Sequence, residues 1–230
     1  MTLTEHQGAT PQAVAAHIAG LLRAAVVARG QASLAVSGGK SPVALFEALR
    51  TQVLDWTRVH IVLVDERVVP HDHADSNTAL VKRYLLQGPA AAAQWTPFFE
   101  TPPTLCSVAA LDALVNQACA RLAALPWPLD VAVLGMGEDA HTASLFPDAA
   151  GYQHAITTLE RLAWVVPANA AHARITLSLQ ALLAARERVL PLSGATKLAV
   201  YRHAVQQADP ALPISLVLTP TQTHTSVWIG

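Results

Sequence analysis

The stretch LDVAVLGMGEDAHTASLFP, residues 129–147, joins a run of apolar residues to a glycine-rich turn. Its first part, 129–135, is almost continuously apolar and does not alternate with polar residues. Such a run is typical of a strand that is buried on both faces of a parallel sheet. Similar runs recur at 33–38, 59–66, 162–167, 188–194, 214–218 and 226–230. The sequence therefore predicts a mostly parallel central sheet.

Helical patterns lie between these predicted strands. Thr10 followed by Pro11 indicates a helix start, because threonine caps a helix and proline suits its first position. The predicted helices are 11–28, 42–50, 78–86, 107–124, 177–185 and 195–207. Alternating strands and helices predict a layered α/β fold with helices flanking the sheet, here as a single domain over residues 1–230. The stretch 87–104 carries several prolines and is predicted to be an irregular surface connection.

Composition narrows the class of protein. The 230 residues are 52% hydrophobic and 13% charged, which suits a large buried core and excludes a disordered chain. The net charge of −1 gives no basic field for nucleic acid or for an anionic membrane. No signal-peptide pattern opens the sequence, and Cys106 and Cys119 are expected to be ordinary thiols. We expect a cytoplasmic protein, monomeric or weakly homo-oligomeric, without nucleic-acid or membrane partners.

Three polar loops follow predicted strands: SGGKSP (37–42), DERVVPHDHADSN (65–77) and GMGEDAHTASLFP (135–147). Ligands of parallel α/β sheets bind at the carboxyl ends of the strands, where these loops lie. We therefore expect the three loops to share one binding site.

The first loop has the composition of an anion site. It resembles the end of a nucleotide-binding phosphate loop, but that motif needs a glycine where Leu34 stands, so we reject it. Glycine-exposed amides and the start of the following helix still suit a phosphate, although a plain tight turn remains an alternative. The candidate residues are Ser37, Gly38, Gly39, Lys40 and Ser41.

The third loop delivers a candidate catalytic histidine. GMGEDA fits a loose dinucleotide-binding pattern, but Pro147 leaves too short a helix after it, so we reject a dinucleotide cofactor. His141 carries an imidazole, which can transfer protons near neutral pH. Asp139 can hold one ring nitrogen and leave the other free as a base. A structural or surface role is the alternative for this lone histidine.

The second loop combines Asp65 and Arg67 with the run HDHAD. Arg67 suits an oxyanion or phosphate clamp. His71 and His73 suggest a metal ion, but no accompanying ligand motif follows, so we expect a solvated loop and no metal or other cofactor. Further along, Arg174 and Lys197 are predicted cationic partners of the same phosphate.

Taken together, SGGKSP, VDERVVP with a later SN, GMGEDAHTASLFP, RITLSLQALLAAR and SGATK resemble the 6-phosphogluconolactonase family. The resemblance covers about residues 11–218. It implies a Rossmann-like fold shared with glucosamine-6-phosphate deaminases and ribose-5-phosphate isomerases.

The resemblance also implies an activity, the metal-free hydrolysis of 6-phospho-D-glucono-1,5-lactone in the oxidative pentose phosphate pathway. His141 would activate the water and Asp139 would orient it. The turn 37–41 with Arg174 and Lys197 would hold the phosphate, Arg67 would bind the substrate or steady negative charge, and Asp65 would line the sugar.

Two departures from the family pattern stand out. Ala140 replaces a usual glycine, which would strain the loop if that residue has a positive φ. Lys40 stands where a small hydroxyl residue is common.

The rival activities are a sugar-phosphate deaminase or isomerase and a non-catalytic sugar-phosphate sensor. Deaminases carry an acid in a run like AFNEP, where this chain has ASLFP.

Overall fold

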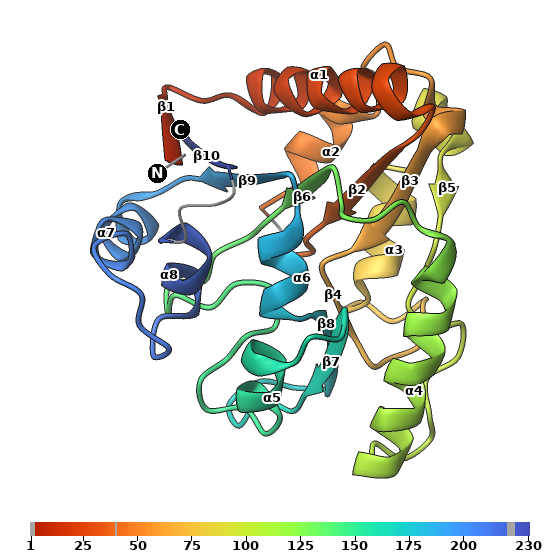
Figure 1. Cartoon of the computed structure of the whole chain (residues 1–230), viewed down its shortest axis with the longest axis vertical. Helices are drawn as coiled ribbons and strands as arrows, with labels where there is room; N and C mark the ends of the chain where they lie inside the picture. The colour runs from red at the N-terminus through yellow and green to blue at the C-terminus, as the bar shows by residue number, and fades with distance from the viewer. Residues whose placement is uncertain (1–2, 40, 220–223) are drawn as a thin grey trace.

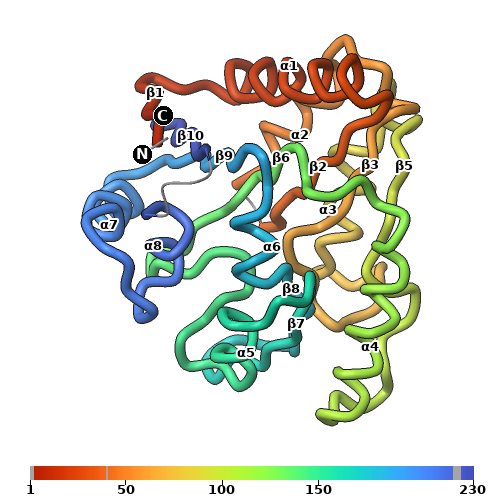
Figure 2. The backbone as a smooth tube through the Cα atoms, in the orientation of Figure 1, coloured from red at the N-terminus to blue at the C-terminus, as the bar shows by residue number. Residues whose placement is uncertain are grey.

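The computed structural model describes residues 3–39, 41–219 and 224–230, which form two sheets with helices around them (Figure 1). The larger sheet has seven parallel strands in the order β1-β10-β9-β6-β2-β3-β5. They are β1 Leu3–Gln7, β2 Ala32–Val36, β3 Val59–Leu63, β5 Gln94–Trp95, β6 Val131–Val133, β9 Glu187–Leu192 and β10 His224–Ile229. The predicted parallel sheet is confirmed. Figure 2 shows the two chain ends side by side, where β1 pairs with β10.

The smaller sheet is antiparallel, in the order β4-β8-β7. Its strands are β4 Asp65–Arg67, β7 Leu162–Val165 and β8 Arg174–Leu177. The prediction placed 162–167 in the parallel sheet and was wrong, because β7 pairs with β8 instead. The amide of Leu177 donates to the carbonyl of Val64, which directly follows β3 (2.8 Å). The small sheet thus begins at the carboxyl end of a strand of the large one.

Eight helices occur in the described parts of the chain. They are α1 Pro11–Arg29, α2 Val43–Leu49, α3 Asn77–Tyr84, α4 Val108–Arg121, α5 Tyr152–Thr157, α6 Leu179–Ala184, α7 Ala195–Ala204 and α8 Pro213–Leu218. The hydroxyl of Thr10 accepts from the amide of Ala13 (3.2 Å), as the predicted start of α1 requires. Helix α2 contacts both α1 and α3, and α8 contacts both α6 and α7. Because the chain adds β2, β3 and β5 in one direction along the sheet and β6, β9 and β10 in the other, right-handed crossovers are expected to put these two groups of helices on opposite faces.

The segment 214–218 is helix α8, and its prediction as a strand was wrong. A short apolar run fits a buried helix as well as a buried strand. Ile214 and Val217 are fully buried, and Pro213 occupies the first turn as Pro11 does in α1. Packing against α6 and α7 therefore decides the conformation of this segment.

The predicted irregular connection 87–104 is more ordered than expected. It contains a 3-10 helix, Gly88–Ala92, and strand β5 at the edge of the large sheet. Phe98 and Phe99 are buried, at 1% and 2% exposure. The aromatic pair therefore anchors this stretch in the core.

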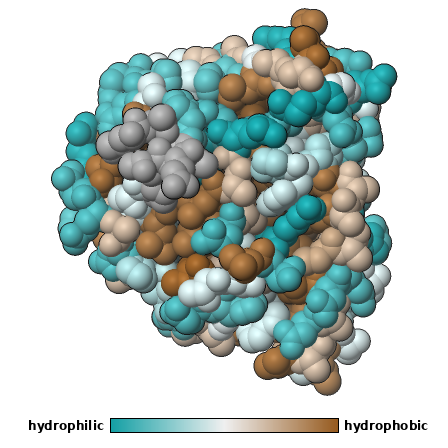
Figure 3. All heavy atoms as spheres, in the orientation of Figure 1, coloured by the Kyte–Doolittle hydropathy of each residue, from teal (hydrophilic) through white to brown (hydrophobic). Residues whose placement is uncertain are grey.

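Helix α1 lies against the large sheet. Ile18 and Leu22 are fully buried there, whereas the outward side mixes hydrophilic and hydrophobic side chains, with Val27 88% exposed (Figure 3). By length and composition alone, α1 is the one described helix that could cross a membrane. Its buried residues show that its apolar side belongs to the core.

The strand order reverses between β2 and β6. From β2 the chain adds β3 and β5 on one side, and it then returns to place β6, β9 and β10 on the other. The carboxyl ends of strands at such a reversal diverge and leave a crevice. The fold therefore predicts a ligand site between the loops that follow β2 and β6.

Candidate active site

A cleft of about 250 Å³ lies at this reversal point. The loops after β2 and β6 line it, together with β4, Pro191 of β9 and Lys197 of α7. Of the predicted site residues, the cleft is lined by Ser37, Gly38, Gly39, Ser41, Asp65, Arg67, His141 and Lys197. Lys40 lies outside the described residues. Residues from all three polar loops therefore line one cleft, as a shared site would require.

The turn after β2 presents its backbone to the cleft. The amide of Ser37 donates to the carbonyl of Val133 (3.1 Å), which ties the turn to β6. A Cβ atom on Gly38 would lie 1.8 Å from Oδ1 of Asn77, so only glycine fits there. Gly39 has a φ of +87°, in the left-handed region that glycine favours. These glycines bring the main chain close to the loop that follows β4.

Glu66 organises that loop, and sequence reasoning missed it. Its side chain is 1% exposed, and its carboxylate accepts from the amides of Arg67 (2.7 Å), Asn77 (2.8 Å) and Thr78 (2.7 Å). The hydroxyl of Ser76 also donates to it (3.2 Å). Glu66 thus binds the first amides of α3 and closes the loop. The signal in the sequence was its place directly after a buried strand.

Asn77 and Asp65 connect two of the cleft-lining loops. The amide of the Asn77 side chain donates to the carbonyl of Asp65 (2.8 Å), and the Asp65 carboxylate accepts from the hydroxyl of Ser144 (2.6 Å). Asp65 and Ser144 are both buried. Asp65 therefore holds the loop after β6 against β4, besides lining the cleft.

Arg67 and Arg174 are cross-strand partners in the β4–β8 ladder. Arg67 lines the cleft, and its Nε is buried without a partner among the described residues. Arg174 is only 7% exposed and is not among the lining residues. Burial and then the charge of Arg67 lower the pKa of Arg174. Arg174 therefore stands opposite Arg67 at the start of β8, outside the lining of the cleft.

Lys197 approaches the cleft from the opposite side. It lies in the first turn of α7, after β9, and is partly buried. Its ammonium group and the guanidinium of Arg67 are the two described cationic side chains that line the cleft. The cleft is therefore suited to an anionic group.

His141 and Asp139 form a hydrogen-bonded pair. The Nδ1 of His141 lies 2.5 Å from Oδ1 of Asp139, and the ring packs against Phe146 with 4.4 Å between centroids. A Cβ atom on Gly137 would lie 2.1 Å from Oδ1 of Asp139 and 2.2 Å from Nδ1 of His141. Glycine at this position therefore leaves room for the pair.

The pair leaves one ring nitrogen for chemistry. Because Nδ1 donates to a carboxylate, Nε2 is the unprotonated nitrogen of the neutral ring. Nε2 has no hydrogen-bond partner in the described parts of the chain. Burial raises the pKa of Asp139, but the charge and hydrogen bonds of His141 outweigh it and hold that pKa below its usual value. Asp139 therefore stays ionised beside the ring.

Ala140 has a φ of +66°. The expected backbone strain is confirmed, because an alanine Cβ crowds the following carbonyl in the left-handed region. The residue is 1% exposed, and its carbonyl accepts from the amide of Ile214 at the start of α8 (2.9 Å). The contact with α8 therefore holds the strained turn in place.

The run HDHAD separates in the structure. The ring of His71 packs against Phe99, with 5.5 Å between centroids, so it is not the solvated residue that was predicted. His73 and Asp75 instead approach His172, from the segment before β8. Cys106 and Cys119 are both free, as expected.

The chain belongs to the glucosamine-6-phosphate isomerase/6-phosphogluconolactonase family, whose model matches residues 5–228. Among its relatives is a 6-phosphogluconolactonase of Pseudomonas aeruginosa, 44% identical over 85% of this chain and 81% of the relative. A 6-phosphogluconolactonase of Neisseria meningitidis serogroup A is 43% identical over 93% and 91%. The crystal structure of a 6-phosphogluconolactonase from Shewanella baltica superposes with a TM-score of 0.90 at 39% identity, covering 100% and 98%.

Proposed function

We propose that this protein is an enzyme that hydrolyses 6-phospho-D-glucono-1,5-lactone to 6-phospho-D-gluconate, the second step of the oxidative pentose phosphate pathway. The observation that carries the proposal is that His141, with Nε2 unpaired, lines the same cleft as Lys197 and Arg67. A substrate with an anion at one end and an activated ester at the other matches this arrangement.

In the proposed reaction, a water molecule loses a proton to Nε2 of His141 as its oxygen attacks the lactone carbonyl carbon. The negative charge that develops on the carbonyl oxygen is stabilised by Arg67. The bond from this carbon to the ring oxygen then breaks, and the imidazolium returns its proton to the departing oxygen. The carboxylic acid product ionises and releases one proton to solvent. The Asp139 carboxylate stabilises the imidazolium throughout.

Binding of the phosphate positions the reacting carbon. Lys197 lines the cleft together with Ser37, Gly38, Gly39 and Ser41 of the turn after β2. Interactions with a remote group fix the lactone beside the base and lower the entropic cost of reaction. A lactone is an activated ester, so the mechanism needs neither a metal nor a covalent intermediate.

The composition of the loop after β6 favours hydrolysis over the related deamination. When the runs AFNEP and ASLFP are aligned at their proline, Phe146 replaces the acid that assists deamination. The ring of Phe146 lies against His141 instead, and an apolar neighbour cannot transfer a proton. A non-catalytic sensor would need the cations but not the His141–Asp139 pair.

A substrate comparison with the purified chain tests the proposal. Freshly generated 6-phosphogluconolactone should be consumed well above its spontaneous rate, whereas glucosamine 6-phosphate should release no ammonia. Turnover of glucosamine 6-phosphate alone would favour the deaminase, and binding of both without turnover would favour the sensor.

We further propose that the chain acts in the cytoplasm as a single domain, monomeric or weakly associated, without nucleic-acid or membrane partners.

A further inference from the structure

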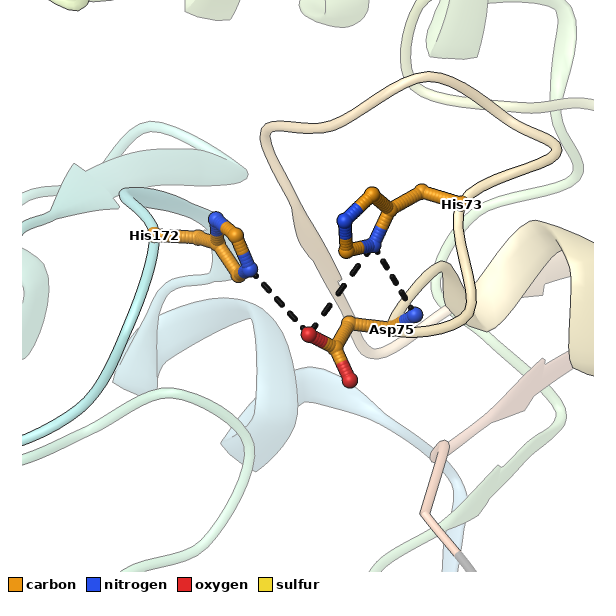
Figure 4. A group of neighbouring side chains, drawn as sticks. All are labelled: His73, Asp75 and His172. Carbon is orange, nitrogen blue, oxygen red and sulfur yellow. Dashed lines mark hydrogen bonds and ion pairs between the residues drawn. The ribbon is translucent and has the colours of Figure 1, made fainter.

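A second histidine–aspartate cluster lies on two loops beside the small sheet (Figure 4). The Nε2 of His172 lies 3.1 Å from Oδ2 of Asp75, and the Nδ1 of His73 lies 3.9 Å from the same oxygen. One potential ligand atom from each residue lies within 4.8 Å of the others. Because 97 positions separate Asp75 from His172, the sequence run HDHAD showed only part of this cluster.

The small sheet preforms the cluster. Arg67 pairs with Arg174 across the β4–β8 ladder, and the amide of Val68 donates to the carbonyl of Ala173 (2.9 Å). The chain leaving β4 is thus fixed next to the chain entering β8. His172 has a φ of +70°, which is unfavourable for a histidine but directs its ring toward Asp75 (Figure 4). The three side chains are therefore already close enough to bind one ion together.

Hydrogen bonding leaves a place for a cation between His73 and Asp75. The amide of Asp75 donates to Nδ1 of His73 (3.1 Å), so the neutral ring carries its proton on Nε2. Nδ1 then has no proton to donate to the carboxylate 3.9 Å away. The lone pairs of Nδ1 of His73 and of the Asp75 carboxylate are therefore both available to a metal ion. The ion would replace the amide of Asp75 as the partner of Nδ1.

We propose that His73, Asp75 and His172 form a binding site for a divalent transition-metal ion of the zinc type. Two imidazole nitrogens and one carboxylate oxygen are typical ligands of zinc, whereas magnesium and calcium prefer oxygen ligands alone. The three side chains are 41%, 55% and 29% exposed, so water can complete the coordination sphere.

This site is linked to the cleft through the backbone. The Nη1 of Arg67 donates to the carbonyl of Asp75 (2.5 Å), and the Nη1 of Arg174 donates to the carbonyl of His172 (3.3 Å). An ion that bridges the two loops fixes both carbonyls and hence both guanidinium groups. The ion supplies no step of the hydrolysis, and its binding does not depend on that proposed function.

Isothermal titration of the tag-free chain with zinc chloride, in a buffer that does not chelate zinc, tests the proposal. The wild type should bind one ion per chain. His73→Ala and His172→Ala should each weaken binding about tenfold or more, in line with the loss of a ligand contact. His154→Ala removes an exposed histidine elsewhere and should bind as the wild type does. Asp75→Asn keeps the shape of the side chain and should weaken binding as well.

Three outcomes would overturn the proposal: no saturable binding to the wild type, equal binding by all these variants, or a loss of binding in His141→Ala, which would place the ion in the cleft.

Thermal unfolding provides a second readout. Because an ion that binds only the folded state stabilises it, zinc should raise the Tm of the wild type and of His154→Ala but not of His172→Ala. Circular dichroism of each variant without zinc checks that it is folded.

Discussion

The histidine–aspartate pairs His141–Asp139 and His172–Asp75 are similar in exposure but differ in geometry. The side chain of His141 is 31% exposed and that of His172 is 29% exposed, and each contacts one carboxylate. His141 uses Nδ1, so its Nε2 remains unpaired in the cleft. His172 uses Nε2, and a second histidine approaches the same carboxylate oxygen.

The difference shows that the neighbours of a histidine–aspartate pair determine its chemistry. A pair with one unpaired nitrogen facing a cleft can transfer protons to and from a substrate. A pair joined by a further nitrogen ligand can chelate an ion. Both carboxylates have pKa values below the usual range, Asp75 chiefly through its hydrogen bond with His172. The charge state therefore does not distinguish the pairs, but the geometry does.

The largest predicted effect separates the pairs by activity. His141→Ala should lower kcat for lactone hydrolysis by about 10²–10⁴-fold, because it removes the general base. His172→Ala should keep kcat within about threefold, since the His172–Asp75 pair has no role in the proposed reaction. Initial rates of lactone hydrolysis, corrected for the spontaneous reaction, measure kcat for the two variants and the wild type. Equal losses in the two variants would contradict the division of roles.

Removal of the Lys197 ammonium group should weaken substrate binding and leave turnover nearly unchanged. Lys197→Ala should raise KM about 10–100-fold, as expected for the loss of a charge-assisted contact, with little change in kcat. Unphosphorylated gluconolactone serves as the control substrate and should show no such change. A similar loss with both lactones would mean that Lys197 does not bind the phosphate. Arg174→Ala should have a smaller effect, because Arg174 is not among the residues that line the cleft.

Asp139→Asn should lower kcat about tenfold or more, because the amide no longer stabilises the imidazolium. Asp75→Asn is the matched control in the second cluster and should leave kcat within about threefold of the wild type. An unchanged kcat in Asp139→Asn would remove Asp139 from its proposed role beside the base.

The smallest predicted effect concerns the strained turn. Ala140→Gly should increase the free energy of unfolding by about 0.5–1 kcal/mol, because glycine accepts a positive φ without strain. Turnover should stay close to that of the wild type. Urea unfolding of the two proteins measures the difference. A less stable variant would show that the methyl group of Ala140, buried against its neighbours, contributes more than the strain costs.

The sequence predicted those parts of the fold that depend on local patterns. The apolar runs marked five of the seven parallel strands, β2, β3, β6, β9 and β10, whereas β1 and β5 were not predicted. Thr10 with Pro11 marked the start of α1. The run 214–218 was misread because five apolar residues fit either conformation, although Pro213 was a start signal of the same kind. The small antiparallel sheet was missed because pairing between β4 and β8 depends on contacts distant in sequence.

The candidate site was predictable to a similar degree. Loops after buried strands identified His141, Arg67 and Lys197, and the structure brings all three to one cleft. Glu66 and Asn77 were missed because their roles depend on the folded loop and not on a spacing. The position of Arg174, buried opposite Arg67, follows from a strand register that local sequence patterns do not reveal.

A crystal structure of the protein with 6-phosphogluconate bound would show whether the phosphate and the reacting carbon lie where the proposed hydrolysis needs them. We expect the phosphate to contact Lys197 and the turn 37–41, and the carboxylate carbon to lie beside Nε2 of His141, directly or through one water. A product bound with its phosphate at His141, or with its carboxylate remote from that ring, would contradict the proposed mechanism.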